Sequence, residues 1–247
     1  TREAVRVFDV SGVEVIRAVN DFDMKSDASD KAGYKHYMLK EIFEQPEAIR
    51  RTLAGRVQSG EVSADAFGAG SQALFSQVKH IQIVACGTSY NAGMVARHWI
   101  EQHVGISCSV EIASEFRYRQ SFVHDGSLLV TLSQSGETAD TLAALRLAQS
   151  LNYLASLTIC NVVTSSLVRE SDFVYLMKAG PEIGVASTKA FTVQLTALLM
   201  LCVAVCQAKQ TNQTFRDEAV EALLQLPESI QQALTLAEPI KALADKF

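Results

Sequence analysis

The sequence has no surplus of positive charge. Its 247 residues include 22 lysines and arginines against 27 aspartates and glutamates, which gives a formal net charge of −5. A general nucleic-acid binder usually presents a basic face, so we expect no nucleic-acid partner. The hydrophobic share of 48% and the charged share of 20% are ordinary for a soluble globular protein.

Long apolar runs are also missing, and we expect no signal peptide. The most lipid-like stretch, residues 195–206, is interrupted by Thr196 and is too short to span a bilayer. It predicts a buried helix and no membrane partner. The first ten residues carry charges throughout, unlike a secretory signal.

Cysteines are few, odd in number and without a CxxC pair: Cys86, Cys108, Cys160, Cys202 and Cys206. Three of them lie in strand-like apolar runs, which predicts buried free thiols in the reducing cytoplasm. Cys202 and Cys206 share a helix face and could ligate a metal, but no histidine or carboxylate lies near them in sequence. Core packing is the better interpretation, and we expect no metal site.

From residue 80 onward, β-prone apolar runs alternate with helical patterns. The predicted strands are 81–85, 109–112, 128–132, 154–160 and 173–177. Five strands with crossover helices predict an α/β fold: a five-stranded parallel sheet, doubly wound, with helices on both faces and flanking helices. A long apolar helix over 188–208 is expected at the centre of this fold. Residues 214–247 predict two amphipathic helices separated near Pro227.

The N-terminal part has a different character. Residues 4–19 predict a β-hairpin, which would be marginal in water alone, and residues 20–33 predict a polar linker. Helical periodicity starts at Tyr34, and Pro46 predicts the start of a second helix that carries Val57. We therefore expect residues 1–30 to be the end of an upstream domain and residues 31–247 to form the main domain.

Three loops at predicted strand ends are rich in hydroxyl groups and small residues: 86–91, 133–138 and 184–188. A buried strand, such a loop and a helix N-terminus together favour anion binding. In an open α/β sheet, ligands bind where strand order reverses, and the first and third strands should flank that point. The alternative is that serine and threonine only cap helices here. Three such loops together favour a site for a phosphorylated small molecule.

Other candidate groups have ordinary interpretations beside the chemical ones. Glu137 and Glu182 could each act as a general acid or base. In the plainer interpretation, Glu137 stabilises the first turn of a helix and Glu182 lies in a solvated loop. Arg117 and Arg119 could contact a substrate or a partner subunit, or only solvent. A GxGxxA match at 68–73 lacks the preceding buried strand that a dinucleotide site needs, so we expect no nucleotide cofactor.

The motifs in these loops resemble the sugar isomerase (SIS) family. They are CGTS at 86–89, SQSGET at 133–138 and EIGVAST at 182–188, with HYMLKEIFEQP at 36–46 and EIASEFRYR at 111–119. The likeness is narrower to those SIS enzymes that join an N-terminal glutaminase to two SIS domains and convert fructose 6-phosphate to glucosamine 6-phosphate. It implies that this chain is the tail of the glutaminase followed by the first SIS domain.

The resemblance also implies a set of sugar-phosphate ligands, carried over by matching motif. They are Thr88, Ser89, Ser133, Gln134, Ser135, Thr138, Val185 and Ser187. Among them, Ser133, Ser135 and Thr138 would hold the phosphate, with Thr88, Ser89 and Ser187 toward the sugar.

The sequence departs from the complete family pattern. It has no N-terminal nucleophilic cysteine, and the family's isomerase base lies in the second SIS domain. We therefore expect a chain that binds hexose 6-phosphate without turning it over, with no catalytic residues of its own. SIS domains commonly pair, so a homodimer is expected. The alternative is a non-enzymatic sugar-phosphate sensor built on an SIS domain.

Overall fold

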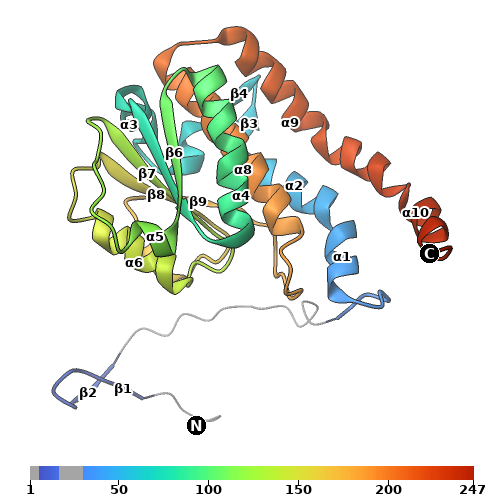
Figure 1. Ribbon diagram of the computed structural model, residues 1–247, viewed down its shortest axis with the longest axis horizontal. Coiled ribbons are helices and arrows are strands. Elements are labelled where there is room, and N and C mark those ends of the chain that lie inside the picture. The colour runs from blue at the N-terminus through green and yellow to red at the C-terminus, as the bar shows by residue number, and fades with distance from the viewer. Residues whose placement is uncertain (1–5, 17–29) are drawn as a thin grey trace. The chain divides into compact units, whose positions relative to one another are not determined.

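The structure of the chain is a computed structural model that describes residues 6–16 and 30–247. The chain forms two units that divide after Asp30 (Figure 1). The first unit contains an antiparallel hairpin of β1 (Val7–Phe8) and β2 (Glu14–Val15). In its turn, the Asp9 carboxylate accepts the N–H of Ser11 at 2.9 Å. The predicted hairpin is confirmed over these residues, and most of the predicted linker lies outside the described residues.

The second unit is built on a five-stranded parallel sheet. Its strands are β5 (His80–Ala85), β6 (Ser107–Ile112), β7 (Ser127–Ser133), β8 (Ala155–Cys160) and β9 (Phe173–Leu176). Their spatial order is β6-β5-β7-β8-β9. The predicted doubly wound α/β sheet is confirmed, and the strand order reverses between β5 and β7, the first and third strands.

Helices cover both faces of this sheet (Figure 1). The helices are α1 (Tyr37–Phe43), α2 (Gln45–Leu53), α3 (Ser71–Gln77), α4 (Gly87–Trp99), α5 (Ala113–Phe116), α6 (Ala139–Ala148), α7 (Ser166–Glu170), α8 (Lys189–Lys209), α9 (Gln213–Leu234) and α10 (Ala237–Ala244). One apolar core joins α3, α4 and α8 to the sheet, and a smaller one joins α5, α6 and α7 to its other face.

Strand β7 shows how the sequence meets both cores. Leu128, Val130 and Leu132 belong to the larger core and Leu129 to the smaller one, because successive side chains point to opposite faces. A strand covered on both sides therefore appears in sequence as one continuous apolar run.

Helix α8 is the central helix of the larger core. The helix is longer than the apolar run at 195–206 indicates, and by length and composition alone it could cross a membrane. However, 72% of its most apolar window is buried inside the fold. Gln194 and Thr196 are buried polar residues on this helix. Its place beneath α2, α3, α4 and α9 explains its apolar surface.

Three local predictions were wrong. Val57 lies on β3 (Val57–Gln58), which pairs with β4 (Glu61–Val62) in a second hairpin before the 3-10 helix η2 (Ala64–Phe67). The helical spacing of Ala92, Val95 and Ala96 predicts that all three lie on the buried face of α4, but Val95 is exposed. Gly93 faces the sheet instead, and an added Cβ there would lie 2.9 Å from Ile83 Cγ2.

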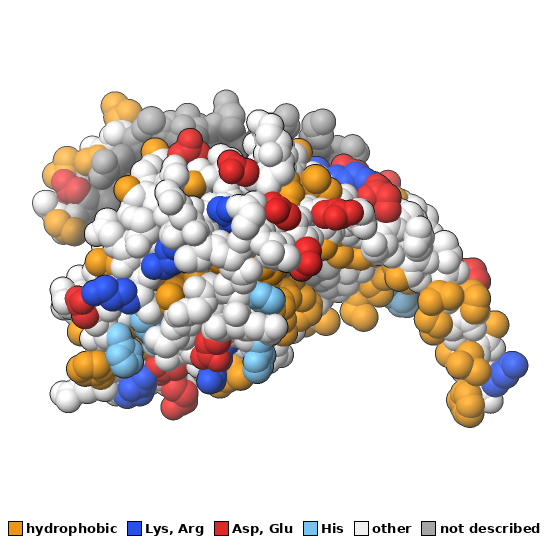
Figure 2. Space-filling model, turned by 90° about the horizontal axis from the view of Figure 1, so that it is seen from above, with side chains coloured by type: hydrophobic (Ala, Val, Ile, Leu, Met, Phe, Trp, Pro, Cys, Tyr) orange, Lys and Arg blue, Asp and Glu red, His pale blue; other side chains and the backbone are white. Residues whose placement is uncertain are grey.

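The third error concerns the C-terminal helices. Helix α9 continues through Pro227 and the break comes at residues 235–236. Proline removes one helical hydrogen bond, but Pro227 is buried and the preceding turns bury Val220 and Leu223. Tertiary packing therefore outweighs the local cost of the proline. Helix α10 has no buried residue, and Ile240 and Leu243 are exposed; Figure 2 shows hydrophobic side chains gathered at this end.

Candidate functional site

The first two hydroxyl-rich loops lie side by side. Ala85, the last residue of β5, pairs with Leu132 near the end of β7, so the loops that follow both strands leave the sheet at the same edge. This is the point where strand order reverses, and ligands of doubly wound folds bind there. The prediction that the first and third strands flank the reversal point is confirmed.

Both loops end at helix N-termini. Helix α4 begins at Gly87 after Cys86, and α6 begins at Ala139 after Thr138. Neither N-cap side chain accepts a hydrogen bond from the first turn. First-turn N–H groups and the positive end of the helix dipole favour an anion at such positions.

The loop at 133–138 is shaped by its own hydroxyl groups. Ser133 Oγ accepts the N–H of Gly136 at 2.9 Å, and Ser135 Oγ accepts the N–H of Glu137 at 3.2 Å. Ser133 Oγ also lies 3.4 Å from Thr138 Oγ1. A serine hydroxyl that accepts such a bond keeps its own proton for donation, so Ser135 can still donate to a ligand oxygen.

Exposure separates the predicted ligands of these two loops. Ser133 and Ser89 are buried, while Gln134, Ser135 and Thr138 are half-buried and Thr88 is exposed. Ser133 therefore shapes the loop. Gln134, Ser135, Thr138 and Thr88 are more open to a ligand than Ser89, of which 9% is exposed.

Gly136 keeps this loop close to the neighbouring strand. Its φ of +68° is costly for other residues, and an added Cβ would lie 2.1 Å from Ser165 Oγ and 2.7 Å from Cys160 Sγ. Its carbonyl accepts the N–H of Leu167 at 3.1 Å. The loop therefore depends on glycine at this position for both conformation and space.

The sequence did not single out Gln194, which reaches the first loop from α8. Its Nε2 donates to Ser89 Oγ at 2.9 Å, and the Gln194 side chain is 0% exposed. A polar residue inside an otherwise apolar helix was the available signal.

The third loop does not offer an open helix N-terminus. Glu182 Oε1 accepts the N–H groups of Thr188 at 2.9 Å and Ala190 at 3.0 Å, at the start of α8. The interpretation of Glu182 as a solvated loop residue was therefore wrong, because it caps the helix. This carboxylate occupies the position that an anion would take at α8.

A second carboxylate, which is buried, holds the same loop. Glu41 on α1 is 3% exposed, and its Oε1 accepts the N–H of Ile183 at 2.6 Å and of Gly184 at 2.9 Å. An added Cβ on Gly184 would lie 2.5 Å from Glu41 Oε2. Val185 is fully exposed and Ser187 is half-buried. Their roles as ligands stay predictions.

Asn161 connects the segment just after β9, which leads to the third loop, with the loop at 133–138. Its side chain accepts the N–H of Ala179 and donates to the carbonyl of Gly180, each at 2.8 Å. Its own N–H donates to the Gln134 carbonyl at 3.3 Å. Sequence analysis missed Asn161, which comes directly after β8 and so lies at the same edge of the sheet.

Three charged groups near these loops have partners. Lys189, next to the third loop, is buried, with Nζ 2.6 Å from Glu44 Oε2. Arg117 donates to Asp140 at 2.8 Å. Glu137 accepts the N–H of Ser166, at the start of α7, at 2.7 Å. This hydrogen bond lowers the pKa of Glu137. Glu137 therefore stabilises the start of α7 and is a poor proton donor at neutral pH.

Over the described part of the chain, no three histidines, cysteines or acidic residues gather as a metal site. All five cysteines are free thiols. Burial raises the pKa of Cys108 to about 12 and that of Cys202 well above its usual value. Both thiols therefore stay protonated at neutral pH and act as core residues.

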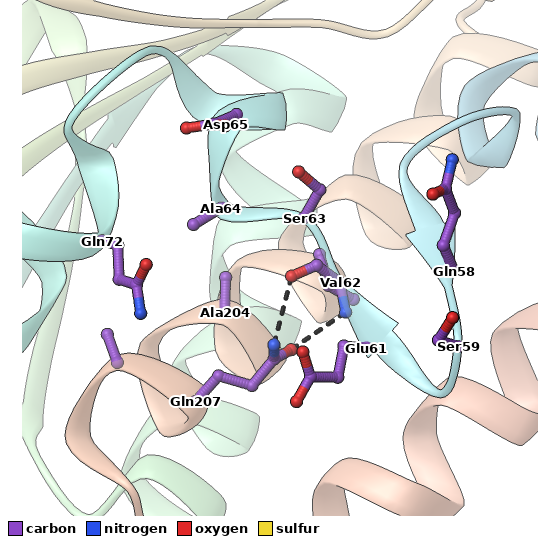
Figure 3. Close-up of a pocket in the computed structure, with 11 residues that line it drawn as sticks. Gln58, Ser59, Glu61, Val62, Ser63, Ala64, Asp65, Gln72, Ala204 and Gln207 are labelled. Atoms are coloured by element: carbon purple, nitrogen blue, oxygen red, sulfur yellow. Dashed lines mark hydrogen bonds between the residues drawn. The ribbon is translucent and has the colours of Figure 1, made fainter.

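A cavity of about 390 Å³ lies elsewhere, between the β3–β4 hairpin, η2 and the later turns of α8 (Figure 3). Gln207 holds the hairpin there by exchanging hydrogen bonds with the backbone of Val62, at 3.0 and 3.2 Å. Glu61 and Asp65 also line it. The cavity is acidic and remote from the open helix N-termini, so it is not suited to a phosphate.

The chain belongs to the SIS domain family, which matches residues 74–204. Isomerizing glutamine–fructose-6-phosphate aminotransferases from Shewanella oneidensis and Escherichia coli are 54% and 55% identical to it over 247 residues. Both alignments cover the whole chain and 41% of the relative. The chain thus spans well under half the length of these curated relatives.

A solved structure shares the fold at similar identity. The C-terminal domain of glucosamine-fructose-6-phosphate aminotransferase from Francisella tularensis is 52% identical, with a TM-score of 0.84 over 87% of this chain and 60% of that one. A putative phosphosugar isomerase from Silicibacter pomeroyi is 26% identical, with a TM-score of 0.66 over 80% of this chain and 56% of that one.

Proposed function

We propose that the chain binds a hexose 6-phosphate, either fructose 6-phosphate or glucosamine 6-phosphate, with its phosphate on the loop at 133–138. One observation carries the proposal: two helices without side-chain caps begin at hydroxyl-rich loops on the adjacent strands β5 and β7. The pairing of Lys189 with Glu44 and of Arg117 with Asp140 leaves hydroxyl and main-chain N–H groups as the natural partners of the anion.

Uncharged donors are sufficient for this task. A hydrogen bond to a charged group contributes about 1.5–3 kcal/mol, and a helix N-terminus about 0.3–2 kcal/mol. Four or five such contacts, less the cost of ordering the ligand, correspond to a Kd between about 1 μM and 1 mM.

The sugar-phosphate site would serve a larger enzyme. The names of the relatives support a role as the sugar-holding part of an aminotransferase that makes glucosamine 6-phosphate from fructose 6-phosphate and glutamine. The buried free thiols fit a place in the reducing cytoplasm. A glutaminase domain and a second SIS domain of the same polypeptide would supply the ammonia and the isomerase base. The alignments with the aminotransferases include the N-terminal hairpin as well as the SIS domain. This favours the enzyme role over a free-standing sensor. On this proposal the chain alone binds its ligand, forms a homodimer and turns nothing over.

Isothermal titration calorimetry tests the binding proposal. Fructose 6-phosphate should bind and a dinucleotide should not. Ser135→Ala should weaken binding by about 1–3 kcal/mol at unchanged stability. Ser150→Ala, in the exposed turn that follows α6, should leave binding unchanged. Equal affinity of the two variants would place the phosphate elsewhere.

Two further measurements test the role of the chain. Glucosamine 6-phosphate formed by the isolated chain from fructose 6-phosphate and ammonia would contradict binding without turnover. Light scattering in solution should give the mass of a dimer, and a strict monomer would count against the proposed pairing.

A further inference from the structure

The side chain of Gln194 connects the core to the candidate site. It lies on the second turn of α8 and is 0% exposed, and its Nε2 donates to Ser89 Oγ at 2.9 Å. Ser89 lies in the first turn of α4, directly behind the open N-terminus of that helix. The amide therefore reaches the binding loop from the interior of the protein.

Stability does not explain a glutamine here. Its Oε1 is buried and has no hydrogen-bond partner among the described residues, and a buried unsatisfied carbonyl destabilises a fold. In the described orientation Oε1 and one N–H of Nε2 have no partner among these residues, whereas rotating the amide by 180° would leave both N–H groups without one. Buried N–H groups lack a partner more rarely than carbonyls do, so the described orientation is the better one. Methionine fills a similar length without any polar atom and would avoid this cost.

We propose that Gln194 is a positioning residue that makes Ser89 a fixed hydrogen-bond donor. Because the Gln194 N–H occupies a lone pair of Ser89 Oγ, the serine proton is free to point toward the ligand position proposed at the first two loops. There it donates to an oxygen of the bound sugar phosphate. This inference rests on the proposed function. It adds a residue outside the loops, Gln194, that determines whether Ser89 donates or accepts a hydrogen bond at the site.

The test combines binding and stability measurements on the 247-residue chain. Gln194→Met should unfold at the same or a higher urea concentration than the unaltered chain, yet bind fructose 6-phosphate about 3- to 10-fold more weakly. Ser89→Ala should lose a similar factor. The double variant should bind no more weakly than Ser89→Ala alone, because Gln194 acts through Ser89.

A matched control comes from the same helix. Thr196 is also buried on α8 and polar, and within the described ranges its hydroxyl donates only to the Thr192 carbonyl, at 3.0 Å. Thr196→Val should therefore bind like the unaltered chain. Unchanged binding by Gln194→Met, or losses that add in the double variant, would overturn the inference. No binding by the unaltered chain would overturn the proposed function first, and this inference with it.

Discussion

Gly136 and Gly87 offer a paired test of how the phosphate loop is built. Both lie in the candidate loops with positive φ, +68° and +57°. An added Cβ on Gly136 would meet Ser165 Oγ at 2.1 Å and Ser165 Cβ at 2.4 Å, whereas one on Gly87 would meet nothing within 4 Å. The two positions thus share the backbone cost of alanine and differ in the steric cost.

The magnitudes follow from that difference. A left-handed backbone costs an alanine about 1–2 kcal/mol, and this is the whole expected loss in unfolding free energy for Gly87→Ala. Gly136→Ala adds the cost of overpacking a close contact, about 1–3 kcal/mol. The Gly136 variant should therefore be the less stable of the two by about 1–3 kcal/mol.

Urea unfolding followed by circular dichroism measures both losses, and an unchanged m-value shows that the midpoints report stability. Equal losses within about 0.5 kcal/mol would show that the loop has room for a side chain at Gly136. The close packing of this loop against β8 and α7 would then be refuted.

Three other predictions concern burial and charge. Glu41→Ala should speed hydrogen exchange at the amides of the loop after β9 and lower the free energy of unfolding by about 1.5–3 kcal/mol. Glu47→Ala, at an exposed site, should do neither. Equal exchange rates in the two variants would contradict the role of Glu41 in holding this loop. In the native chain, a thiol reagent at neutral pH should modify half-buried Cys86 first, and fast reaction of a second thiol would contradict the burial of the others. Burial, and then repulsion from a neighbouring histidine, lower the pKa of His80 below 6.5, so its contribution to stability is present above pH 6.5 and is lost as the pH falls through its folded pKa. His80→Gln should therefore flatten the fall in stability between about pH 7 and pH 5, and an unchanged slope would refute this.

Much of the sheet could be predicted from sequence, because its central strands β5, β7 and β8 are covered on both faces and appear as largely apolar runs. The run at 128–132 is such a case, and β7 extends it by one residue at each end. The same reasoning placed the first two loops together, since the right-handed doubly wound order puts the first and third strands side by side.

What sequence reasoning missed depends on contacts between distant segments. Gln194 meets Ser89 across 105 positions, and Glu41 meets Gly184 across 143. No local pattern records such a pairing. Helix α9 continues through Pro227 for the same reason, because its buried face outweighs the local signal.

The central claim is that uncharged hydroxyl groups and main-chain N–H groups hold the phosphate. Amide chemical shifts of the chain, measured while fructose 6-phosphate or fructose is added, test it most directly. The account predicts large shifts at residues 133–139 with the phosphate ester and none there with fructose. Shifts that gather instead around exposed lysines or arginines would contradict it.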